Sequence, residues 1–143
     1  MNHLARLLRA IADALEPKQT LELPSPKIRI TQEQARKIIE LVKTVPGYED
    51  CFIVAIAPTN SMEPGIDDGM YCIMQPVPYT DLIVGDIIWY MTPSYTAIHR
   101  IVKIGSDPIG WFCRTSGDNN HGAIDPVKIR PEHIKGTWRM TIN

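Results

Sequence analysis

Apolar and polar residues recur at helical spacing over the first fifteen positions of the chain. Arg6, Arg9 and Asp13 fall off the apolar stripe, so the pattern predicts a short amphipathic helix within residues 1–15. Prolines at positions 17, 24 and 26 interrupt any continuation, and residues 16–26 are therefore expected to form an extended arm. The stripe consists of Leu4, Leu7, Leu8, Ile11 and Leu15.

A second helix is predicted to start at Thr31. The sequence Thr-Gln-Glu-Gln at residues 31–34 fits a capping box, in which the Thr31 and Gln34 side chains satisfy each other's backbone N–H groups. Four apolar residues then share one helix face, and Pro46-Gly47 is expected to end the helix. The apolar face consists of Ala35, Ile38, Ile39 and Val42.

From about Cys51 onward the pattern changes to short apolar runs separated by turn residues such as Pro64-Gly65. Several short strands with regular turns predict a mainly β fold, either a sandwich or a partly open barrel, that carries a two-helix N-terminal extension. We therefore divide the chain into a helical arm and linker at residues 1–48 and a β domain at residues 49–143. The predicted strands are residues 52–57, 70–74, 86–91, 97–104, 111–115 and 136–142.

Composition limits the classes of partner. The chain has 143 residues, with 15 Lys and Arg against 16 Asp and Glu, and a net charge of -1 gives no reason to expect binding to nucleic acid. The long proline-rich spacer also argues against a helix-turn-helix in residues 1–45. No apolar run approaches the ~18 residues of a membrane-spanning helix, and no export signal is apparent. We therefore expect a cytoplasmic protein with no transmembrane segment.

The three cysteines, Cys51, Cys72 and Cys113, are widely spaced and form no Cys-x-x-Cys pair. This spacing favours reduced, buried thiols over disulfides or a zinc site. His121 and His133 lack a spacing typical of metal ligands. We therefore expect neither a metal nor an organic cofactor.

Three stretches could carry chemistry, although each alone is more often structural. Ser61 lies in a loop between Pro58 and Pro64, directly after a predicted strand. His99 interrupts an apolar strand, and a polar loop at residues 117–125 contains two carboxylates, Asp118 and Asp125.

Together, and in this order, the stretches resemble the sequence boxes of type I signal peptidases, particularly the branch found in archaea and the endoplasmic reticulum. The resemblance covers roughly residues 51 to 140. LexA-type repressors are related to these peptidases and use a lysine as base, whereas here His99 takes that position and the nearest lysine is Lys103. The matching boxes are Ser-Met-Glu-Pro at residues 61–64, Gly-Asp-Ile-Ile at 85–88, His-Arg-Ile-Val at 99–102, and Gly-Asp-Asn-Asn at 117–120 with Asp125.

The resemblance implies a serine endopeptidase that works through an acyl-enzyme. Ser61 would be the nucleophile and His99 its general base, because a serine hydroxyl needs a base within hydrogen-bond reach. Asp125 is the first choice for the carboxylate that orients His99, and Asp118 is the second. The backbone N–H of Ser61 and the hydroxyl of Thr59 would stabilise the oxyanion.

Two features modify this expectation. Asn60 stands where many members of the family carry glycine, and asparagine tolerates a left-handed backbone if one is required there. These peptidases are normally anchored in a membrane, whereas this sequence predicts no anchor. The expected substrate is therefore a protein or peptide reached without an anchor, as suits stand-alone forms encoded by phages or mobile elements.

Two alternatives stay open. The same fold could serve as a structural or assembly protein, for example of a phage particle, with an idle Ser-His pair and residues 1–30 wrapping a neighbouring subunit. Such a protein would be virion-associated. A self-cleaving switch of LexA type is the third reading, and it is disfavoured because the chain contains no Ala-Gly pair.

Overall fold

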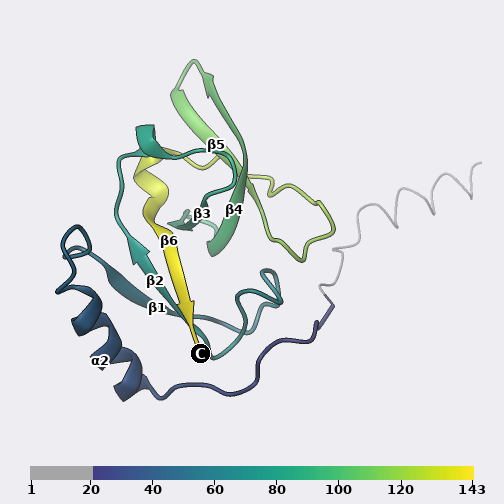
Figure 1. Ribbon diagram of the computed structural model, residues 1–143. Helices are drawn as coiled ribbons and strands as arrows, with labels where there is room; N and C mark the ends of the chain where they lie inside the picture. Colours follow the sequence, from purple (N-terminus) through teal and green to yellow (C-terminus); the bar gives the residue numbers. More distant parts are fainter. Residues whose placement is uncertain (1–20) are drawn as a thin grey trace, which may run out of the picture.

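The computed structural model describes residues 21–143, so the helix predicted within residues 1–15 lies outside the described part. Six antiparallel strands form one open sheet in the order β1-β2-β6-β3-β4-β5, and helix α2 packs beside β1 (Figure 1). The prediction of a mainly β fold is thus confirmed. The elements are α2 (Gln32–Val42), β1 (Phe52–Ala55), β2 (Tyr71–Gln75), β3 (Ile87–Met91), β4 (Thr96–Asp107), β5 (Gly110–Ser116) and β6 (Ile134–Ile142), with short 3₁₀ turns at Tyr79–Asp81 and Pro131–His133.

Helix α2 begins as the sequence predicts. The backbone N–H of Gln34 donates to Thr31 Oγ1 at 3.1 Å, and the N–H of Thr31 donates to Gln34 Oε1 at 2.7 Å. Ile39 is buried against Cys51 and Ile73, which fixes the helix to the first two strands. The helix ends at Val42, before Pro46, because the next residues tighten into a turn in which the Thr44 N–H bonds the Leu41 carbonyl.

Strand β4 pairs with different neighbours along its length. Residues Thr96 to Arg100 pair with β3, whereas β5 joins β4 only from Arg100 onward. His99 therefore lies one residue before the point where β5 begins to cover the second edge of β4. In the pairing of the described strands, that edge is left open over the stretch that leads up to His99.

The buried apolar side chains of the described residues form three clusters. One contains Tyr90, Ile101 and Cys113, and another contains Met62 and Cys72. All three cysteines are buried and free, and Met62 is buried as well. In the described part of the chain, no helix has the length and apolar character needed to cross a bilayer.

Candidate active site

Three of the residues singled out in the sequence lie in one hydrogen-bonded row. His99 Nε2 lies 3.1 Å from Ser61 Oγ, and His99 Nδ1 lies 2.6 Å from Asp125 Oδ2. The carboxylate can only accept, so Nδ1 donates to it, and in the neutral imidazole Nε2 is then the acceptor that faces the Ser61 hydroxyl. This is the arrangement that a serine nucleophile and a histidine base require.

Ser61 lies on the loop between β1 and β2, which we call the nucleophile loop (residues 58–69). Asn60 adopts a left-handed backbone with φ of 57°, a conformation that asparagine tolerates better than most residues. The Ser61 carbonyl accepts a hydrogen bond of 2.9 Å from the N–H of Asn119. Gly117 passes so close that a Cβ there would lie 2.6 Å from the Ser61 carbonyl oxygen. A glycine at 117 therefore lets the two loops meet at Ser61.

His99 is held by the sheet itself. It is buried in β4 opposite Ile88 of β3, and its ring meets the ring of Tyr90 edge-on with centroids 6.5 Å apart. Because both its backbone and its ring are packed, His99 has little freedom to leave the line between Ser61 and Asp125.

Asp125 is fixed by two hydroxyls that sequence reasoning missed. Thr115 Oγ1 donates to Asp125 Oδ2 at 2.6 Å, and Tyr90 OH donates to the same oxygen at 3.2 Å. Burial raises the pKa of Asp125, but the hydrogen bonds from His99 and Thr115 outweigh it and bring that pKa below its ordinary value. Asp125 therefore stays ionised beside His99. In the sequence, Tyr90 and Thr115 both look like ordinary members of predicted strands, so no local signal singled them out.

Asp118, the second choice for orienting His99, makes a different contact. Its two carboxylate oxygens accept from Arg100 Nε at 2.8 Å and Arg100 Nη2 at 2.7 Å. Successive side chains of a strand face opposite sides, so Arg100 draws Asp118 away from His99. Arg100 Nη1 also donates to the Gly85 carbonyl at 2.8 Å. Asp118 thus ties its own loop to β4, and Asp125 is the carboxylate at His99.

Thr59, expected at the oxyanion position, lies beside Ser61. Its Oγ1 is 3.2 Å from Ser61 Oγ. The hydroxyl is therefore close enough to reach an oxygen that develops on an atom bonded to Ser61.

A groove of about 330 Å³ opens at Ser61 and His99. It runs between the end of β1 and the beginning of β4, where the edge of β4 is open. The side chains that line it are mostly apolar, and several of them are short. They include Ala55, Ile56, Ala57, Trp89, Ala97 and Ile98.

Comparison with known proteins adds no relative: no protein-family model and no curated protein matches the chain. Among the described residues, no group of three or more His, Cys, Asp or Glu side chains is arranged to hold a metal ion. The functional argument therefore depends on the geometry of the site and on the sequence boxes.

Proposed function

We propose that this chain is a serine endopeptidase with Ser61 as nucleophile, His99 as general base and Asp125 as the residue that orients His99. The observation that carries the proposal is the continuous row of hydrogen bonds from Ser61 through His99 to Asp125 at the mouth of an apolar groove. A half-buried, ionised carboxylate on one side of a histidine and a hydroxyl on the other serve no evident packing purpose.

The proposed reaction has two halves. Ser61 Oγ attacks the carbonyl carbon of a peptide bond while its proton passes to His99 Nε2, and Asp125 stabilises the imidazolium that forms. The Ser61 N–H and the Thr59 hydroxyl stabilise the oxyanion. The C–N bond then breaks as Nε2 returns the proton to the leaving amine. Water repeats the sequence on the ester, releasing the acid and restoring Ser61.

The proposed substrate is an extended segment of a protein or peptide. The open edge of β4 before His99 offers backbone groups to a strand lying in the groove, which is a common way to bind an extended chain. Ala55, Ala57 and Ala97 make the walls shallow, which favours small apolar side chains next to the cleaved bond.

The signal-peptidase-like fold is part of the same proposal. Its support is that Arg100, within the third sequence box, joins the second and fourth boxes by bonding the Gly85 carbonyl and Asp118. The first box joins them through Ser61, which contacts His99 of the third box and Asn119 of the fourth, so all four motifs meet around one strand. Motifs that occurred independently would have no reason to contact one another.

A digestion experiment tests the activity. The full chain is incubated with a library of peptides derived from a proteome, and the new termini are identified by mass spectrometry. We expect cleavage after small residues by the wild type and none by Ser61→Ala or His99→Ala, with circular dichroism reporting folding. Identical cleavage by Ser61→Ala would overturn the proposal. A folded wild type that cleaves nothing would favour the assembly role.

A further inference from the structure

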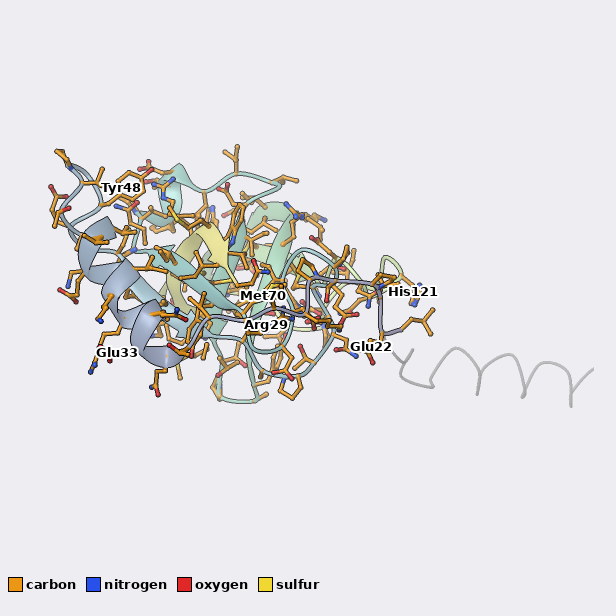
Figure 2. All side chains as sticks on the ribbon, turned by 60° about the horizontal axis from the view of Figure 1, so that its bottom comes forward. Glu22, Arg29, Glu33, Tyr48, Met70 and His121 are labelled. Carbon is orange, nitrogen blue, oxygen red and sulfur yellow. The ribbon has the colours of Figure 1, made fainter. Side chains whose placement is uncertain are left out.

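The extended segment before α2 is bound to the nucleophile loop. We call residues 21–29 the strap. Its inward-facing side chains, Leu23 and Ser25, are half-buried, whereas Glu22 and Pro24 are exposed, as expected for an extended chain that lies on a surface. In Figure 2, Arg29 lies close to Met70 at one end of this segment, and Glu22 lies towards His121 at the other. The strap therefore spans the loop that carries Ser61.

The strap supplies donors to two buried carboxylates. Glu63 is 2% exposed, and its Oε2 accepts from the backbone N–H of Leu23 at 2.5 Å. Its other oxygen, Oε1, accepts no hydrogen bond from the described residues. Asp67 is 4% exposed; it accepts from the Ser25 hydroxyl and, within its own loop, from the backbone N–H of Asp68 at 2.7 Å. Because a buried carboxylate with too few donors is costly, the donors of the strap stabilise both groups, and Glu63 depends on the strap more than Asp67 does.

Positive charge reinforces the second contact. Arg29 Nη2 lies 3.5 Å and Lys27 Nζ 3.7 Å from Asp67 Oδ2, and Arg29 Nε donates to the carbonyl of Asp68 at 2.8 Å. The end of the strap nearest α2 is thus fixed by several interactions. The end nearest Ser61 depends on single hydrogen bonds, so it is the weaker half.

A third contact links the strap to the backbone around the nucleophile. Asn119 Nδ2 donates to the Leu21 carbonyl at 2.6 Å and to the Asn60 carbonyl at 2.9 Å. The N–H of the same asparagine bonds the Ser61 carbonyl. One residue therefore contacts the strap and the carbonyls of both Asn60 and Ser61, while Glu63 follows Ser61 by two positions.

We propose that the strap is a positioning element of the active site: docked on Glu63, Asp67 and Asn119, it holds the nucleophile loop with Ser61 in line with His99, and its displacement lowers the reactivity of Ser61. This inference rests on the proposed function and adds its regulation. Any partner that binds residues 21–29, or pulls on the chain before them, would control the enzyme without touching the groove.

Two variants of the full chain test the strap. Leu23→Pro removes the N–H that bonds Glu63, and Ser25→Ala removes the hydroxyl that bonds Asp67. Glu22→Pro is the matched control, since successive N–H groups of an extended chain point in opposite directions and the Glu22 side chain is 72% exposed. Its ion pair with Lys27 is exposed and contributes little.

Two measurements are made on each variant: amide hydrogen exchange over residues 60–69 and 119, and the rate at which a fluorophosphonate labels Ser61. We expect both strap variants to exchange faster at these residues, and Leu23→Pro to label about tenfold more slowly, whereas Glu22→Pro behaves as wild type. Unchanged hydrogen exchange in both variants would overturn the proposal that the strap holds the nucleophile loop, whatever the labelling rate of Ser61. Faster exchange with undiminished labelling would overturn its control of Ser61. Absence of labelling in the wild type would instead overturn the proposed function, while exchange still decides whether the strap holds the loop.

Discussion

The two halves of the candidate site are held in different ways. His99 is buried in the sheet, and Asp125 is held against it by the buried hydroxyls of Tyr90 and Thr115. Ser61 lies on an irregular loop whose position depends on Gly117 and on Asn119. The sheet therefore holds His99 in place, whereas the position of Ser61 depends on contacts of a loop. Under the proposed function, control would act through Ser61.

The largest effect on activity should come from a change at His99 and Asp125, the half of the site that is held by the sheet. Asp125→Asn removes the charge that fixes and stabilises His99, and we expect the rate of peptide cleavage to fall by on the order of 10³-fold or more. Asp118→Asn is the matched control, because Asp118 bonds the exposed side chain of Arg100; we expect a change below about threefold. Equal losses in the two variants would contradict the assignment of Asp125.

A methyl group added at Gly117 should disturb the position of Ser61 with little effect on His99. The Cβ of Gly117→Ala would lie 2.6 Å from both the Ser61 carbonyl oxygen and Asn120 Nδ2, so the Gly117 loop and the nucleophile loop must move apart, and we expect cleavage to fall about 100-fold. Gly65→Ala adds the same methyl group within the nucleophile loop but meets nothing within 4 Å. Fluorophosphonate labelling of the two variants checks this, and equal rates would show that the contact at Gly117 does not position Ser61.

The smallest effect is expected from removing the Thr115 hydroxyl, which supports Asp125 and, through it, His99. Thr115→Val keeps the shape of the side chain but removes the donor to Asp125, and we expect about a tenfold loss of cleavage. The hydrogen bond from Thr115 contributes to lowering the pKa of Asp125, so its stabilisation is present above the pKa of the unfolded chain and is lost as pH falls through the folded pKa.

Urea unfolding of the wild type and of Thr115→Val as a function of pH tests the direction of this pH dependence. The difference in the free energy of unfolding should be larger near neutral pH and shrink below about pH 4. A difference that grows on acidification would show that the Thr115 hydroxyl does not favour the ionised form of Asp125.

Sequence patterns predicted the regular parts of the molecule well. The capping box at Thr31 and the apolar runs mark α2 and the six strands because both signals are local. The boxes also pointed to Ser61, His99 and Asp125, which the fold brings together. They left Asp118 and Asp125 open as partners of His99, since the choice depends on which face of β4 each side chain approaches.

Long-range contacts between irregular segments could not be predicted from the sequence. Nothing in the local pattern of residues 21–29 indicates that Leu23 bonds Glu63, forty positions away. Tyr90 and Thr115 look like ordinary strand residues until the chain folds and places both hydroxyls on one carboxylate oxygen. The mainly β character follows from periodicity, whereas the support of the site follows from tertiary packing.

The reactivity of Ser61 tests the central claim most directly. The folded full chain is treated with a fluorophosphonate, and the adduct is located by mass spectrometry of its peptides. The account predicts a single adduct on Ser61 that is absent in Ser61→Ala and strongly reduced in His99→Ala. An adduct that persists in Ser61→Ala, or a folded wild type that takes up no reagent at Ser61, would contradict it.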